Sequence, residues 1–210
     1  MQLMTDPDDE FIPTRQSLLE RLRRWDDQEG WQQFFDTYWK LIYRTARKAG
    51  LSAVEAEEVV QETVIGVARR MPDFHYRAEG GSFKSWLLRQ TKWRIGDQLR
   101  KRRREGFMIG VENMEEAEAL AVISNPVANK LEDLWDAEWE LNLLDAALAH
   151  VKSRIEPRHY QIFHLTALKH WSALRVARSL KVSLAQVYTV KHRVAKEVRA
   201  ALTRVKKRAP

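Results

Sequence analysis

Cysteine is absent from the 210-residue chain. Without thiols the chain can form no disulfide, no cysteine-ligated zinc or iron–sulfur site and no thiol nucleophile. Long apolar runs are also missing, since no stretch approaches the roughly 18 residues that would span a bilayer. The first ten residues are acidic and lack the basic-then-apolar order of a signal peptide. These absences predict a cytoplasmic protein with no membrane role.

Glycine and proline are scarce, at eight and six residues, and no Asn-Gly or Asp-Gly pair marks a β-hairpin. Apolar residues instead recur at three- and four-residue intervals, which predicts amphipathic helices. Ser52 with Glu55 three residues later is typical of a capping box at a helix start. We therefore predict an all-α protein with two small helical domains, at 1–104 and 131–210, joined by an acidic linker at 105–130.

The 36 basic and 29 acidic residues are distributed unevenly. Residues 84–104 hold nine bases and one acid, residues 105–145 hold eleven acids and one base, and residues 169–208 hold twelve bases and one acid. Two basic blocks separated by an acidic one favour two surfaces that meet a polyanion such as nucleic acid. Solvated helix faces are the alternative that the charge alone leaves open.

Residues 172–205 follow the order of a helix-turn-helix, with a short helix, a turn at 181–183 and a longer basic helix. On a helical wheel Val187, Val190 and Val194 share the face that would dock the second helix. The opposite face carries small, polar and cationic residues suited to base edges and phosphates. Its members and flanking residues are Ala185, Thr189, His192, Lys196 and Arg199, with Tyr188 and Arg193 beside them.

The basic helix predicted from residue 82 to about 104 has a second, non-apolar side. Trp86 and Trp93, two turns apart, project there beside Arg89 and Arg100. Aromatic rings interleaved with cations suit unstacked bases, because each ring is a stacking platform worth about 1–3 kcal/mol per base. Packing of either tryptophan against a neighbouring helix is the alternative.

An acidic cluster lies on the helix after Ser52, formed by Glu55, Glu57, Glu58, Gln61 and Glu62. Metal ligation by these carboxylates would need histidine partners from other helices, as in a di-iron bundle, and none of the six histidines supplies that pattern. Catalytic carboxylates would need a pocket that the sequence does not indicate. A patch that faces another protein is the better interpretation, and we predict no metal, cofactor or catalytic residue.

Four motifs, taken in order, resemble bacterial sigma factors of the extracytoplasmic-function group. AEEVVQE at 56–62, GSFKSWLLR at 81–89 and DQLRKRRR at 97–104 look like the second region, and the stretch from VSLAQVY at 182–188 to 194 looks like the fourth. The resemblance implies that the first domain binds core RNA polymerase and that both domains bind promoter DNA.

The resemblance also implies residue roles. Contact with the largest catalytic subunit of polymerase falls to Glu57, Glu58, Gln61 and Glu62. Recognition and melting of the −10 element falls to Phe74, His75, Tyr76, Arg77, Lys84, Trp86, Arg89, Trp93 and Arg100. Reading of the −35 element falls to Arg175, Ala185, Gln186, Tyr188, Thr189, His192, Arg193 and Lys196. An anti-sigma partner is left open.

Three positions depart from the family pattern. Trp93 stands where an asparagine often lines the pocket for a flipped base, and Arg175 stands where glutamate is common. Lys181 replaces the usual turn glycine, which costs about 1 kcal/mol if that residue has a positive φ. Two rival functions remain: a helix-turn-helix regulator that works without polymerase, and a helical-bundle enzyme that uses Glu57, Glu58 or Glu62.

Overall fold

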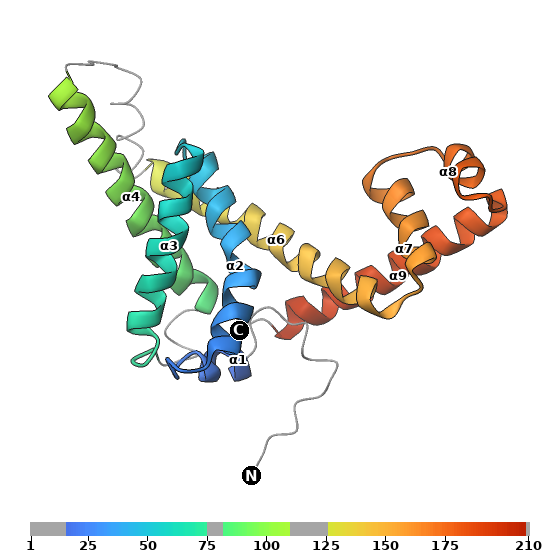
Figure 1. The fold of residues 1–210 in the computed structure, drawn as a ribbon, viewed down its shortest axis with the longest axis horizontal. Helices are drawn as coiled ribbons and strands as arrows, with labels where there is room; N and C mark the ends of the chain where they lie inside the picture. The colour runs from blue at the N-terminus through green and yellow to red at the C-terminus, as the bar shows by residue number, and fades with distance from the viewer. Residues whose placement is uncertain (1–15, 75–81, 110–125, 209–210) are drawn as a thin grey trace, which may run out of the picture. The chain divides into compact units, whose positions relative to one another are not determined.

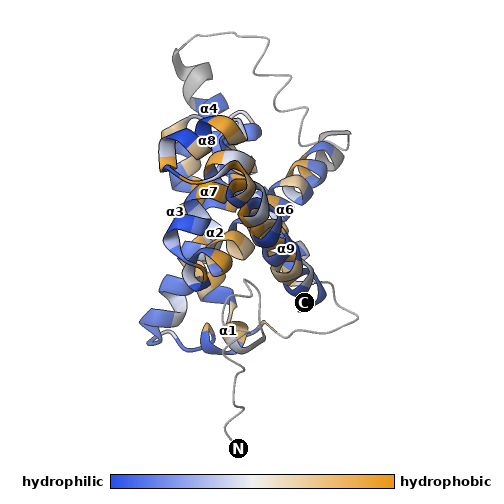
Figure 2. Cartoon of the chain, turned by 90° about the vertical axis from the view of Figure 1, so that its right-hand side faces the viewer, coloured by the Kyte–Doolittle hydropathy of each residue, from blue (hydrophilic) through white to orange (hydrophobic). Residues whose placement is uncertain are grey.

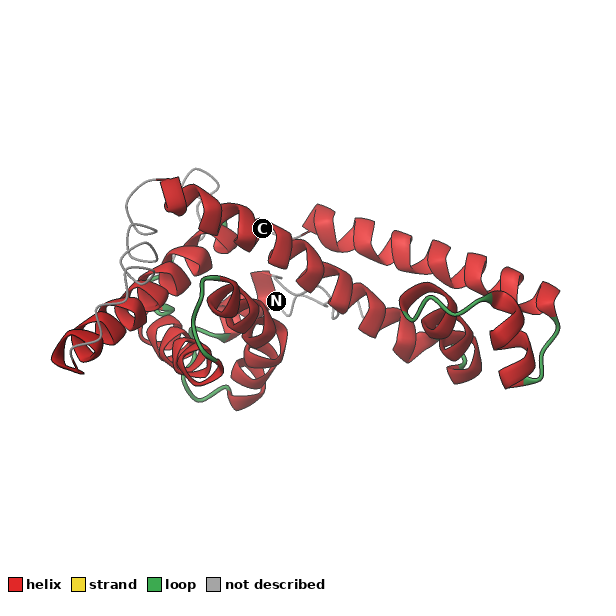
Figure 3. Ribbon diagram, turned by 90° about the horizontal axis from the view of Figure 1, so that it is seen from above, coloured by secondary structure: helices red, strands yellow, loops and turns green. Residues whose placement is uncertain are grey.

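The computed structural model describes residues 16–74, 82–109 and 126–208 (Figure 1). Within these ranges every regular element is helical, as Figure 3 shows, and the all-α prediction is confirmed. The elements are α1 (Gln16–Arg21), α2 (Gln28–Lys48), α3 (Ala53–Arg70), α4 (Phe83–Ile109), α6 (Pro126–Arg154), α7 (Pro157–Phe163), the π-helix η2 (His164–Leu168), α8 (Ala173–Leu180) and α9 (Leu184–Arg208).

The chain divides into two compact units, which we call the N-terminal unit (Thr14–Asn142) and the C-terminal unit (Leu143–Ala209). Both ends of the predicted 105–130 linker are helical, because α4 continues to Ile109 and α6 begins at Pro126. Residues 110–125 lie outside the described residues. The functional division into domains at 1–104 and 131–210 stays a prediction.

Helix boundaries in the N-terminal unit follow local capping chemistry. The capping box expected at Ser52 is present: the Ser52 hydroxyl accepts from the Glu55 amide, and the Glu55 carboxylate accepts from the Ser52 amide at 2.7 Å. Gly50, just before it, has a φ of 90°, a conformation that glycine adopts without steric cost. Asp27 caps α2 through the Gly30 amide at 2.8 Å, and Arg21 holds the same carboxylate, which keeps the pKa of Asp27 below its usual range.

The core of the N-terminal unit is aromatic and aliphatic. Phe34 and Tyr38 of α2 are fully buried and contact Phe83 of α4, with ring centroids 6.4 and 5.6 Å apart. On α4, Phe83 begins a buried stripe that continues through Leu87, Thr91, Ile95 and Leu99.

The first half of α6 belongs to the N-terminal unit, whereas we expected residues from 131 onward to belong to the second domain. Leu131, Trp135 and Trp139 are buried, and Trp139 stacks on Tyr38 of α2 at 5.9 Å between centroids. The apolar period continues across residues 131–151, so the sequence pattern alone did not reveal where the burial partner changes.

The core of the C-terminal unit forms around α9. Val187, Val190, Val194 and Val198 are buried against Ile162 and Phe163 of α7, Val176 of α8 and Ala147 of α6. Figure 2 shows hydrophilic and hydrophobic residues alternating along these helices. Among the described residues, no helix is both long and apolar enough to cross a membrane.

Candidate nucleic-acid interface

The acidic cluster of α3 is split between two directions. Glu58 accepts a hydrogen bond from Gln98 Nε2 of α4 at 2.8 Å, and Glu62 Oε2 lies 3.3 Å from Arg94 Nη1. Both carboxylates line a groove between α3 and α4. Gln61 lines the same groove, and Glu57, Gln61 and Glu62 are exposed. Of the residues that the resemblance assigns to polymerase, Glu58 and Glu62 thus contact α4, and all but Glu58 are exposed.

Glu55 is tied to α4 more firmly than the rest of the cluster. Arg102 Nε donates to Glu55 Oε1 at 2.8 Å, and the Arg102 guanidinium also reaches the Gly50 carbonyl oxygen. The hydrogen bond from Arg102 lowers the pKa of Glu55 to about 2, although partial burial opposes this shift. Glu55 therefore joins α3 to α4 and caps its own helix at the same time.

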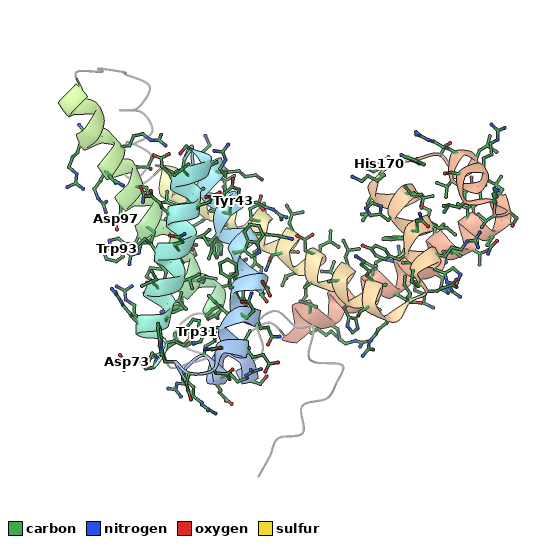
Figure 4. All side chains as sticks on the ribbon, viewed as in Figure 1. Trp31, Tyr43, Asp73, Trp93, Asp97 and His170 are labelled. Atoms are coloured by element: carbon green, nitrogen blue, oxygen red, sulfur yellow. The ribbon has the colours of Figure 1, made fainter. Side chains whose placement is uncertain are left out.

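Trp93 is half-exposed, at 50% of its surface, and two arginines contact its ring. The guanidinium carbon of Arg94 lies 4.8 Å from the ring centroid, and that of Arg70, from the last turn of α3, lies 5.4 Å away. Gln90 accepts a hydrogen bond from Arg70 and so fixes that arginine. Figure 4 labels Trp93 on α4 beside α3. An open indole held by two cations is a platform on which a base can stack.

Trp86 is more enclosed than Trp93. Its ring lies 4.7 Å from Phe74 and 5.6 Å from Phe83, so it packs at the edge of the core, as the alternative interpretation of the sequence has it. Phe74 is the last residue described before residue 82. The predicted −10 residues His75, Tyr76 and Arg77 lie outside the described residues.

The remaining −10 candidates divide between two sides of α4. Arg89 is exposed, and Arg100 forms an ion pair with Asp97. Lys84 instead faces α6: its Nζ lies 2.8 Å from Asp136 Oδ1 and 5.8 Å from the Trp139 centroid. Lys84 is therefore engaged within the protein, apart from the Trp93 platform.

The helix-turn-helix predicted in the second half of the chain is built as expected. Ser172 caps α8 by accepting from the Arg175 amide, and Ser183 accepts from the Gln186 amide at the start of α9. Between them Lys181 adopts a left-handed conformation, with φ 51° and ψ 50°. The condition under which replacing the usual glycine costs about 1 kcal/mol is thus met at Lys181.

The face of α9 opposite its valines is open. Exposed there are Ala185, Gln186, Tyr188, Thr189, His192, Arg193, Lys196 and Arg199. Tyr188 has 59% of its surface exposed. Arg193 Nη2 donates to His159 Nδ1 of α7 at 2.8 Å, so His159 orients this arginine. Arg175 of α8 lies on the Trp171 ring, 3.6 Å from its centroid.

Comparison with known proteins shows what the chain is similar to. Residues 34–105 match the family described as Sigma-70 region 2. The chain is also similar to the RNA polymerase sigma factor NccH of Alcaligenes xylosoxydans xylosoxydans, with 26% identity over 201 residues, 95% of this chain and 96% of the relative. A Sigma-70 region 2 thus lies at residues 34–105 of this chain. The region 2 match includes α3 and most of α2 and α4, which carry the exposed pair Glu57 and Gln61 and the Trp93 platform.

Several residues of this candidate interface were missed from sequence. Arg70 was interpreted only as the end of α3, and no local pattern links it to Trp93. His159 lies far along the chain from Arg193, so only the fold brings them together. Lys92 was within the basic block but was not selected; its eight-residue spacing from Lys84 was the available signal. Among the described residues, no three His, Asp or Glu side chains gather to hold a metal.

Proposed function

We propose that this sigma factor binds core RNA polymerase and directs it to promoters through two DNA-binding surfaces, without bond chemistry of its own. One observation carries the proposal: within the region 2 match, the half-exposed indole of Trp93 lies beside the guanidinium groups of Arg70 and Arg94. A duplex regulator has no use for such a platform, whereas a melted strand offers unstacked bases to it. Acting on core polymerase places the protein in the cytoplasm.

The exposed part of the acidic cluster supports a contact with polymerase. Glu57 and Gln61 lie one turn apart on α3 and are exposed, so a partner can reach both. Glu58 and the exposed Glu62 also pair with cations of α4, so we assign them mainly to the α3–α4 interface. The primary contact with polymerase is therefore assigned to Glu57 and Gln61.

The two DNA surfaces differ in what they read. Around Trp93 the chemistry is stacking and charge, which fits a single strand at the −10 element. On α9, Arg193 and Lys196 are exposed beside small and polar residues, which fits a major groove at the −35 element. Arg175 retains its predicted role through a phosphate contact, because Trp171 holds its guanidinium at the surface.

Transcription with purified core polymerase tests the proposal. Adding the chain should produce transcripts with defined starts on a subset of genomic fragments, and core polymerase alone should not. Glu57→Lys should abolish co-elution with core polymerase, because it reverses an exposed charge in the assigned contact. Asp133→Lys, an equal reversal at an exposed residue of α6, should co-elute normally. If the chain neither co-elutes nor changes transcript starts, the regulator hypothesis replaces this one.

A further inference from the structure

The first half of α6 carries an acidic segment (residues 131–142) that docks on α2 and α4 within the N-terminal unit. Trp135 is fully buried, and Trp139 is buried between Tyr38 and Lys84. Glu138, with 1% of its side chain exposed, lies 2.7 Å from Lys48 Nζ and 3.8 Å from Arg44 Nη1 of α2. A buried carboxylate without its cation is strongly unfavourable, so these pairs fix the position of the segment.

Two further carboxylates of the acidic segment contact α4. Asp136 pairs with Lys84 at 2.8 Å, and Glu132 pairs with Lys92 at 2.9 Å. The two acids are one helical turn apart and the two lysines two turns apart, so each row presents its charges on one side of its helix. The carboxylates of Asp136 and Glu132 therefore neutralise the two lysines in the way that two DNA phosphates would.

The two kinds of pair differ in exposure. The side chains of Asp136 and Glu132 are 65% and 53% exposed, in contrast to Glu138, and those of Lys84 and Lys92 are 29% and 30% exposed. Ion pairs with a solvent-exposed partner contribute little to stability, so another anion can compete for the lysines. The segment can therefore stay anchored by its tryptophans and Glu138 while Asp136 and Glu132 exchange for another anion.

We propose that the acidic segment is an intramolecular competitor of promoter DNA, which occupies Lys84 and Lys92 in the free protein and yields them to DNA phosphates. The inference rests on the proposed function of α4 in binding the −10 strand. It assigns Lys92, which was not among the −10 candidates, to the same basic row as Lys84. It also predicts that the free chain binds DNA less tightly than its basic composition would allow.

Neutralising the two acids tests the competition. The probe is a short fluorescein-labelled single-stranded DNA of mixed sequence, and the measurement is anisotropy with the full chain. Asp136→Asn and Glu132→Gln should each tighten binding about two- to fivefold, the range expected for removing one exposed ion pair. Asp133→Asn removes the same charge from an exposed neighbour and should change affinity by less than about 1.5-fold, because the ion pairs of Lys84 and Lys92 are with Asp136 and Glu132. Equal tightening by all three variants would overturn the inference.

A double-mutant cycle tests whether the effect of Asp136→Asn on DNA binding acts through Lys84 and not through α9. In a Lys84→Gln background the effect of Asp136→Asn should disappear, since the lysine that it releases is gone. If the effect persists undiminished, the acid acts through the general field and the inference fails.

Lysine acetylation, read by mass spectrometry, separates this inference from the proposed function. In the Asp136→Asn chain Lys84 should become more reactive, and the DNA probe should protect it again. Unchanged reactivity, or no protection by DNA, would overturn the inference. Neither result would affect transcription with core polymerase, which tests the proposed function independently.

Discussion

The two helices proposed to meet DNA, α4 and α9, are both basic, yet their cations are engaged differently. On α4, Arg94, Lys101 and Arg102 pair with carboxylates of α3, and Lys84 and Lys92 pair with carboxylates of α6. On α9, no described carboxylate lies within ion-pair distance of Lys191, Lys196 or Arg199. Two helices of similar basic composition thus differ in how many of their cations are engaged within the protein.

The difference follows from position in the fold. Helix α4 lies against α3 and α6 within its unit, so its cations help to hold the bundle, and DNA has to compete with internal acids for them. Helix α9 presents its valines to the core and its cations to solvent. Charge changes at the α4 cations that pair with α3 should therefore alter folding, whereas those on α9 should alter binding alone.

The largest effect is expected at Arg102. Arg102→Ala leaves the Glu55 carboxylate partly buried without its cation and removes two contacts to the Gly50 carbonyl oxygen. We expect the free energy of unfolding to fall by about 2 kcal/mol, within the range for a buried group that loses a charged partner. Urea titration measures it. The neighbouring exposed Arg103→Ala should stay within about 0.5 kcal/mol, and equal losses would remove the bundle-holding role.

Lowering the pH should weaken the same contact between Glu55 and Arg102. The pKa of Glu55 falls from 4.5 to about 2 on folding, so the stabilisation is complete above pH 4.5 and is lost as the pH falls toward 2. Glu55→Gln should therefore flatten the decline of unfolding free energy across this window. The measurement is urea titration at several pH values. An unchanged slope would show that folding does not lower the pKa of Glu55.

Trp93 should matter for melted DNA but not for stability. Trp93→Ala removes the stacking platform and should weaken binding of a fork-junction promoter by holoenzyme by about 1–3 kcal/mol. Trp93→Phe keeps a smaller ring and should recover part of this loss. Fluorescence of a base analogue in the melted strand gives the readout. If the alanine variant melts promoters normally, the platform assignment is wrong.

A substitution in the turn before α9 should increase the stability of the C-terminal unit. Lys181 has a φ of 51°, so Lys181→Gly should stabilise the C-terminal unit by about 1 kcal/mol. Lys191→Gly, in the middle of α9, should have the opposite sign and a similar size. Slower hydrogen exchange in α8 and α9 for the first variant, and faster exchange for the second, would confirm the pair. Identical signs would mean that the turn carries no strain.

Sequence reasoning was most successful where structure depends on neighbours along the chain. The capping box at Ser52, the αL turn at Lys181 and the valine face of α9 each involve residues within a few positions of one another. Local chemistry determines such features, and the structure matches the predictions.

It was least successful where pairing spans the chain. Glu58 and Glu57 are equivalent in sequence, and only the position of α4 separates a paired acid from an exposed one. The resemblance assigned Lys84 to DNA, which stays a prediction, and no local pattern indicated its pairing with Asp136, which lies beyond residues 105–130. The site residues were thus identifiable by type, but their engagement depended on which helices meet.

The smallest effect should be at Lys196, and it completes the comparison. Lys196→Ala should leave the unfolding free energy unchanged within about 0.5 kcal/mol, since the side chain is exposed on α9. It should weaken binding to a −35 duplex equally for all sequences and lower the salt dependence of log K by about one, as expected for a single phosphate contact. Binding isotherms at several salt concentrations provide both quantities. A change of sequence preference would instead make Lys196 a reader of bases, and a loss of stability would make α9 resemble α4.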